Sequence, residues 1–279
     1  MKKAVVFLIM ILSLWGEVVL AQGHQDREKE NSKNVPRGMV RIPGGSYQPF
    51  LQPGNQPDII TVRSFYIDIY AVTNEEFLAF VKANPRWAKS KVSRLYADNN
   101  YLRQWAGDFT IGNKKIYTSP VTNISWFAAN AYCKWKGRRM PTMNEWEYAG
   151  EAAPAGMKKG QKLSAIILDW YGRPTPPVLP PVGSTFKNSF GVYDMHGLIW
   201  EWVYDFNSII TGGGSGNTGA VQKNLFCAAG SLNAANKEDY AAFMRYAFRE
   251  SLKGAYCVAN LGFRCAMDIP QKGASYDNR

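Results

Sequence analysis

The sequence has few of the residues from which metal and redox sites are built. Among its 279 residues, only four are cysteine and two are histidine. The cysteines are Cys133, Cys227, Cys257 and Cys265. No two of them form a C-x-x-C pair, so a thioredoxin-type redox centre is not expected. The histidines, His24 and His196, lie far apart in the sequence, which disfavours a zinc site.

Long hydrophobic runs are also scarce, and the one present stands at the N-terminus. Residues 4–15 form an apolar run of 12 residues, which is too short for a membrane-spanning helix of about 20 residues. Lys2 and Lys3 precede this run, and Val19 and Ala21 occupy the −3 and −1 positions of a signal-peptidase cleavage site before Gln22. The pattern is typical of a secretory signal peptide. We therefore predict an exported protein, periplasmic or secreted, that is not an integral membrane protein.

The remaining length is sufficient for one domain with a sizeable core. We predict a signal peptide at residues 1–21 and a flexible polar tether at 22–37. One domain then occupies residues 38–268, and residues 269–279 form a C-terminal tail. The sequence shows no internal repeat.

The net charge of +11 could indicate a nucleic-acid-binding protein. However, the basic residues do not gather into one long stripe, and export would separate the protein from nucleic acid. We therefore expect no nucleic-acid partner. The charge instead favours an acidic partner or an envelope surface.

Capping and turn residues indicate an irregular α+β domain. Alternating apolar and polar residues predict strands within 38–47 and 61–70. Thr73 and Glu76 form a capping box, which opens a helix that ends before Pro85.

Two further helices are predicted in the middle of the chain. Ser125 caps the first, and Gly137 is positioned to end it. Thr142 and Glu145 form a second capping box, which opens a short helix. Residues 173–183, RPTPPVLPPVG, predict an extended polyproline-type connection because proline cannot continue a helix or a central strand.

A resemblance to a known family begins at residues 123–149, which read NISWFAANAYCKWKGRRMPTMNEWEYA. This segment resembles the sulfatase-modifying-factor family, which includes the formylglycine-generating enzyme. The matching residues are Ser125, Trp126, Ala129, Tyr132, Cys133, Trp135, Arg139, Pro141, Thr142, Glu145, Trp146, Glu147, Tyr148 and Ala149. Four other segments match in order, reading MVRIPGGSY, FYIDIYAVTNEEF, PVGSTFKNSFGVYDMHGLIWEW and NLGFRCAM. The resemblance covers residues 38–268 and implies a C-type-lectin-like α+β fold, with little regular structure around a shallow groove.

Four cysteines in an exported chain favour two disulfides, and the residues alone leave three pairings open. The resemblance implies a disulfide-stapled fold in which Cys133 pairs with Cys265. Cys227 and Cys257 remain, and a second disulfide between them is the favoured interpretation. The alternative is a redox-active or metal-binding pair.

The sequence departs from the family at the copper site. Formylglycine-generating enzymes carry two cysteines five residues apart after a G-G-S motif, and these thiolates bind Cu(I). The corresponding segment here, residues 230–249, contains no cysteine. The resemblance therefore does not extend to copper binding, and formylglycine-generating activity is not expected. Whether the protein is an enzyme of another kind stays open.

The family's calcium-binding turn is also altered. Its G-N-x-W-E-W motif reads GLIWEW here, with Leu198 in place of the asparagine. Glu201 together with backbone carbonyls could still hold calcium. Glu201 hydrogen-bonded to backbone amides of the turn is an equal alternative.

Four residues match positions that border the family's peptide-binding groove: Trp202, Ser231, Arg249 and Asn260. Each also has a structural interpretation. Trp202 could be a core residue, Arg249 an ion-pair partner, Asn260 a turn former and Ser231 a strand hydroxyl. For each residue taken singly, the structural interpretation is favoured. As a cluster, the four residues indicate a binding groove.

The resemblance and its departures favour a binding function. We predict an exported protein that binds a peptide or a partner protein and so assists the maturation or assembly of another envelope protein. The first alternative is a divergent oxidoreductase of the same family, acting on a protein or peptide. The second is a carbohydrate-binding lectin-like module, which rests on analogy of fold alone.

Overall fold

The computed structural model describes residues 35–49, 59–207 and 237–270. The chain divides into two compact units, residues 1–39 and residues 40–279. Within the first unit, residues 35–39 are described, and they form a turn that leads into a strand. The helices and the packing described below belong to the second unit.

The strands are short. They are β1 (Met39–Ile42), β2 (Gly45–Tyr47), β3 (Ile60–Val62), β4 (Phe65–Asp68), β5 (Trp200–Trp202), β6 (Leu261–Phe263) and β7 (Ala266–Asp268). Each of the strands predicted within 38–47 and 61–70 is therefore divided in two. The first division falls at Pro43 and Gly44, where proline removes a backbone donor and glycine loosens the chain.

The helices are α2 (Asn74–Ala83), α3 (Trp126–Trp135), α4 (Met143–Gly150), α5 (Leu163–Tyr171) and α8 (Lys237–Glu250), with short 3-10 helices η1 (Pro85–Trp87) and η2 (Lys114–Ile116). Both predicted capping boxes are confirmed. The Thr73 side chain accepts from the Glu76 N–H, and the Glu76 carboxylate accepts from the Thr73 N–H at 2.9 Å. Thr142 and Glu145 make the same pair of contacts at the start of α4. Helices α5 and α8 were not predicted from the sequence.

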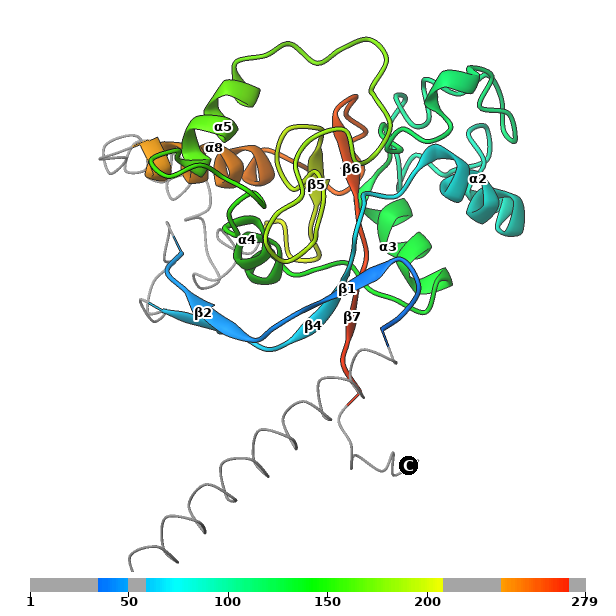
Figure 1. Cartoon of the computed structure of the whole chain (residues 1–279). Helices are drawn as coiled ribbons and strands as arrows, with labels where there is room; N and C mark the ends of the chain where they lie inside the picture. The colour runs from blue at the N-terminus through cyan, green and yellow to red at the C-terminus, as the bar shows by residue number, and fades with distance from the viewer. Residues whose placement is uncertain (1–34, 50–58, 208–236, 271–279) are drawn as a thin grey trace, which may run out of the picture. The chain divides into compact units, whose positions relative to one another are not determined.

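The strands form three small sheets, so the mixed α+β class is confirmed. Their orders are β1-β4-β7, β2-β3 and β5-β6. In the first, β4 and β7 are antiparallel, with Tyr66 opposite Met267. In the third, β5 and β6 are parallel, with Glu201 opposite Gly262. Figure 1 shows β5 and β6 between the pair α5 and α8 on one side and the pair α2 and α3 on the other.

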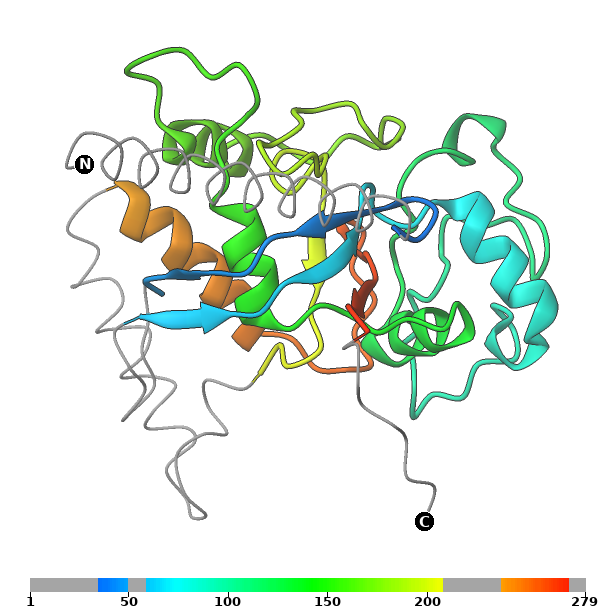
Figure 2. The same cartoon turned by 60° about the horizontal axis from the view of Figure 1, so that its bottom comes forward.

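Aromatic rings fill the core between α2, α3 and β6. Phe77 of α2 stacks on Tyr132 of α3 with 5.8 Å between ring centroids, and it meets Phe263 of β6 edge-on at 6.2 Å. Helix α4 contacts β3, and Figure 2 shows it behind the blue and cyan strands β1 to β4. Phe77, Tyr132 and Phe263 are all buried, so these ring contacts form part of the hydrophobic core.

The disulfide between Cys133 and Cys265 is confirmed. It joins α3 to the residues between β6 and β7, with 5.6 Å between the two Cα atoms. The two cysteines are 132 residues apart in the sequence. Closing so long a loop restricts the unfolded chain strongly, which stabilises the fold.

The proline-rich connection between α5 and β5 contains no helix or strand over residues 173–183, as predicted. It leads from the end of α5 towards the segment that precedes β5. Among the described residues, no helix is long and apolar enough to cross a membrane.

A candidate binding site

A cavity of about 580 Å³ opens between α5, β5 and the proline-rich connection. We call it the aromatic cavity. Its lining includes Trp170, Tyr171, Pro174, His196, Trp200 and Asn260. The volume is in the range of cavities that bind small molecules or peptide side chains.

Stacked rings form one wall of the aromatic cavity. Tyr171 of α5 stacks on Trp200 of β5 with 4.8 Å between centroids, and Trp170 lies 5.3 Å from Trp200. From α8, Phe248 supports Trp200 at 4.5 Å. Helices α5 and α8 contact each other, so both hold the wall in place. Trp170, Tyr171 and Trp200 are half-buried and line the cavity with apolar surface against which an apolar or aromatic group can pack.

Asn260 contributes a polar group to the same cavity. Its side-chain amide donates to the Thr175 hydroxyl at 3.2 Å, and its backbone carbonyl accepts from the Trp200 N–H at 2.8 Å. These contacts fix Asn260 between the proline-rich connection and β5. Asn260 thus lies on the wall of the aromatic cavity, and its assignment to a peptide-binding groove stays a prediction.

His196 is a buried, neutral residue that also lines the aromatic cavity. Burial, reinforced by the charge of Arg245, lowers its pKa from 6.5 to about 3. Its Nε2 lies 3.0 Å from the Gly150 carbonyl oxygen, which can only accept, so Nε2 carries the proton. Nδ1 then presents a lone pair, for which the described residues supply no donor. His196 also lines a second cavity of about 360 Å³, together with Glu147 and Arg245.

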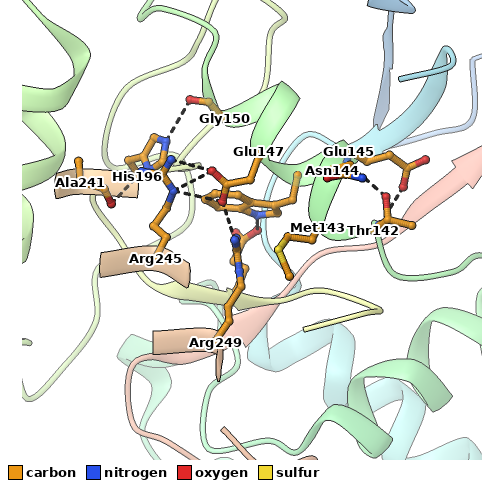
Figure 3. Close-up of polar contacts among 12 residues, drawn as sticks. Thr142, Met143, Asn144, Glu145, Glu147, Gly150, His196, Ala241, Arg245 and Arg249 are labelled. Atoms are coloured by element: carbon orange, nitrogen blue, oxygen red, sulfur yellow. Dashed lines mark hydrogen bonds and ion pairs between the residues drawn. The ribbon is translucent and has the colours of Figure 1, made fainter. Parts of the chain in front are cut away.

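Glu147 and two arginines form a buried ion-pair network, shown in Figure 3. Arg245 Nη2 donates to Glu147 Oε2 at 2.6 Å, and Arg249 Nη1 donates to Oε1 at 2.5 Å. Burial by itself would raise the pKa of Glu147, but the charges of Arg245 and Arg249 outweigh it and lower the pKa to about 2. The carboxylate is thus ionised and locks α4 to α8.

Two groove assignments made from the sequence are wrong. Trp202 is fully buried, and its indole N–H donates to the Ile124 carbonyl at 3.0 Å. Arg249 is buried against Glu147 and lies over the Trp146 ring, with 4.6 Å to its centroid. Both residues therefore have the structural role that was favoured for each of them singly, Trp202 in the core and Arg249 as an ion-pair partner. Ser231 lies outside the described residues.

Glu201 does not fit a calcium site. Arg264 donates to both of its carboxylate oxygens, from Nε at 2.8 Å and from Nη2 at 2.7 Å, and Trp146 donates to Oε2 at 2.8 Å. A calcium ion there would have to displace a buried guanidinium. The described residues contain no cluster of three or more acidic, cysteine or histidine side chains suited to a metal. Glu201 is therefore a hydrogen-bonded structural residue. Its donors are the side chains of Trp146 and Arg264, and not the backbone amides of the turn that the alternative named.

Cys257, the third cysteine among the described residues, does not have the environment of a reactive thiol. Cys257 is buried and free, and its Sγ donates to the Ala255 carbonyl at 3.5 Å. Burial and the charge of Asp98 raise the pKa of the thiol well above its usual range, which suppresses the reactive thiolate. Its predicted partner, Cys227, lies outside the described residues, so the second disulfide stays a prediction.

Sequence reasoning missed the residues that form most of the aromatic cavity. Trp170 and Tyr171 stand at the end of the apolar segment LSAIILDWY, which has the length and apolar spacing of a helix. This helical pattern directly before the proline-rich connection could have predicted α5 and its aromatic end. For His196 there was no local signal, because its burial depends on residues of α4 and α8.

Comparison with known proteins places the chain in a family. The model of the "sulfatase-modifying factor enzyme 1-like domain" matches residues 24–269. The formylglycine-generating enzyme of Streptomyces coelicolor is 31% identical, covering 83% of this chain and 90% of that protein. The inactive Cα-formylglycine-generating enzyme 2 of Bos taurus is 30% identical, covering 59% of this chain and 69% of that protein.

Two other matches differ in length or in similarity. The serine/threonine-protein kinase pkn1 of Chlamydia pneumoniae is 27% identical over 88% of this chain, which spans 40% of the length of that relative. The solved structure of PvdO from Pseudomonas aeruginosa is 21% identical, with a TM-score of 0.47, covering 83% of this chain and 94% of that one. Because the family model matches nearly the whole domain, the chain belongs to the sulfatase-modifying factor enzyme 1-like domain family.

Proposed function

We propose that the protein is exported and binds a peptide segment of another envelope protein in the aromatic cavity, and so assists the maturation or assembly of that protein. The observation that carries the proposal is the cavity itself. It combines the stacked rings of Trp170, Tyr171 and Trp200 with the amide of Asn260. Such a combination suits a peptide, whose side chain can stack while its backbone forms hydrogen bonds.

The sequence supports binding without copper chemistry. From Ala228 to Tyr256 the chain contains no cysteine. The two thiolates that the resemblance associates with Cu(I) are therefore missing from this chain. The family also contains relatives that are named inactive formylglycine-generating enzymes. A member that keeps the domain without that activity is thus plausible in evolutionary terms.

Two features support export. The first residues have the pattern of a signal peptide, with two lysines before an apolar run. The disulfide between Cys133 and Cys265 is stable in an oxidising compartment such as the periplasm.

The experiment begins with a displayed library of random peptides selected on the purified protein. The affinity of a selected peptide is then measured for the wild type, Trp170→Ala and Asn260→Ala. We expect each variant to bind about tenfold more weakly, because each removes part of the cavity wall. Phe109→Ala removes an exposed ring that does not line the cavity and is the matched control. Failure to select a peptide, or unchanged affinity in both variants, would refute the proposal.

The same purified protein tests the alternative of an oxidoreductase. It is incubated with Cu(I), oxygen and a cysteine-bearing peptide, and the peptide is then weighed. We expect an unchanged mass. Conversion of the cysteine to an aldehyde would establish catalysis and contradict the proposal.

A further inference from the structure

A second, separate surface is rich in cations and aromatic rings. Residues 84–97, NPRWAKSKVSRLYA, contain four basic residues and no acidic residue. Arg86, Lys91 and Arg94 are exposed, and within the described ranges none of them forms an ion pair with a carboxylate. The fourth, Lys89, is turned inward, where its ammonium donates to the carbonyl of Trp105 at 2.5 Å.

The carboxylates that border this surface are already engaged. Asp108 accepts from the N–H and the hydroxyl of Ser90, both at 2.7 Å. Asp98 accepts from the backbone N–H groups of Asn100 and Cys257, at 2.8 and 3.1 Å. Neither carboxylate bridges to the exposed cations. Hydrogen bonds from neutral donors leave both carboxylates negatively charged, and the pKa of Asp108 is lowered by its hydrogen bonds from Ser90 and, to a lesser extent, by the nearby charge of Lys91. The four basic residues of the segment still outnumber these two carboxylates, so the surface keeps a net positive charge.

A cleft of about 340 Å³ lies among these cations. We call it the basic aromatic cleft. It is lined by Arg86, Trp87, Lys91, Val92, Ser93, Tyr96 and Phe127. Tyr96 is 44% exposed and meets Trp87 at 6.1 Å and Phe127 edge-on at 5.3 Å, measured between ring centroids. The rings give the cleft apolar walls, and the two cations give it a positive border.

The indole N–H of Trp87 is a buried donor for which the described residues supply no acceptor. Trp87 itself is 7% exposed, and Arg86 lies over its ring at 5.7 Å from the centroid. Trp87 is therefore a buried part of the cleft wall, and its indole N–H has almost no exposed surface for a partner to reach.

We infer that the basic aromatic cleft binds an acidic segment of a partner protein. One apolar side chain of that segment enters between Trp87, Tyr96 and Phe127, and flanking carboxylates face Arg86, Lys91 and Arg94. A membrane surface suits the site less well, because a cleft with three aromatic walls fits one side chain rather than a flat layer of lipid. The inference does not depend on the function proposed for the aromatic cavity, which lies on different elements.

The test uses the purified protein and a short synthetic peptide with one leucine flanked on both sides by glutamates. The triple variant Arg86→Gln, Lys91→Gln and Arg94→Gln removes the three cations. The triple variant Lys114→Gln, Lys115→Gln and Lys159→Gln removes the same charge from other exposed positions and is the control. We expect the first triple to weaken the affinity by about tenfold or more, and the control to leave it nearly unchanged.

Changes to the peptide test the two halves of the inference. Replacing its glutamates with glutamines, or its leucine with serine, should each weaken binding. Tyr96→Ala removes the most exposed ring of the cleft, and it should also weaken binding. Trp170→Ala, in the aromatic cavity, should leave binding of this peptide unchanged, so that failure of one proposal is distinct from failure of the other.

Three results would overturn the inference. The first is no binding of the peptide, and the second is equal weakening by both triple variants. The third is that the protein binds phosphatidylglycerol vesicles but neither the peptide nor phosphatidylcholine vesicles, and that the first triple variant abolishes this binding. That result would identify an anionic membrane as the partner.

Discussion

Arg249 lies over the ring of Trp146, with 4.6 Å between its guanidinium carbon and the ring centroid. From that position the guanidinium donates to Glu147, the residue that follows Trp146 in α4. One arginine of α8 thus holds two consecutive residues of α4. A residue assigned to a binding groove from its sequence is instead part of the connection between two helices.

Replacing Arg249 should destabilise the protein. Arg249→Ala removes one of the two guanidinium groups that bind the buried Glu147 carboxylate, while Arg245 still compensates its charge, and we expect a loss of about 1–3 kcal/mol in the free energy of unfolding. Arg173→Ala breaks the exposed pair with Asp169 and should cost less than about 1 kcal/mol. Urea denaturation measures both. Similar losses in the two variants would show that the Glu147 network does not hold the helices together.

His196 should make stability depend on pH. Its pKa is lowered from 6.5 to about 3, so between these values the unfolded chain binds a proton that the folded chain does not. The free energy of unfolding therefore falls as the pH falls through this range. Glu147, with its pKa lowered from 4.5 to about 2, adds to the loss below its ordinary value.

Asp68 acts in the opposite direction, because burial raises its pKa from 3.8 to about 6 in the folded state. The contribution of the histidine is isolated by comparing the wild type with His196→Gln. Urea unfolding is followed in both proteins from about pH 7 to about pH 4. We expect the variant to lose less stability on acidification than the wild type. Parallel curves would mean that His196 is not a buried neutral imidazole.

The disulfide should contribute substantially to stability. Cys133→Ala with Cys265→Ala opens a loop of 132 residues and should cost roughly 4–5 kcal/mol in the chain-entropy model. A reductant should lower the melting temperature of the wild type and have little effect on that double variant. Cys257→Ala should cost less, because the structure gives it a free thiol. If Cys257→Ala lost as much stability as the double variant, and if reductant still lowered the melting temperature of the double variant, a disulfide between Cys257 and Cys227 would be supported instead.

Calcium should have no effect that acts through Glu201. Glu201→Gln leaves the buried guanidinium of Arg264 without its charge partner, and we expect a lower melting temperature with or without calcium. The melting temperatures of wild type and variant are compared in calcium and in a chelator. A rise caused by calcium in the wild type and abolished in Glu201→Gln would show that the carboxylate is a calcium ligand after all.

Local features of the fold could be predicted from the sequence. The capping boxes at Thr73 and Thr142 depend on residues three positions apart, so their signal is contained in a few letters. The pairing of Cys133 with Cys265 was implied by the resemblance, because both motifs were present in order. In each case the information lay in short, recognisable segments.

The candidate site was predicted only in part, because it depends on burial across distant segments. Asn260 lines the aromatic cavity, whereas Trp202 is fully buried. Both belong to family motifs, and nothing in the letters distinguishes a groove position from the core beneath it. Helix α8 shows the same limit. It contacts α5, and two of its arginines pair with Glu147 of α4; both helices are remote in the sequence, so its role became clear only from the packing.

The central claim is that this member of the family binds a peptide in the aromatic cavity, through the stacked rings that line it. Calorimetric titration of one selected peptide into the wild type and into Trp170→Ala, side by side with Phe109→Ala, addresses it most directly. The account predicts a dissociation constant about ten times larger for Trp170→Ala and one close to the wild-type value for Phe109→Ala. If the indole of Trp170 can be removed with no change in affinity, the peptide binds elsewhere and the account is contradicted.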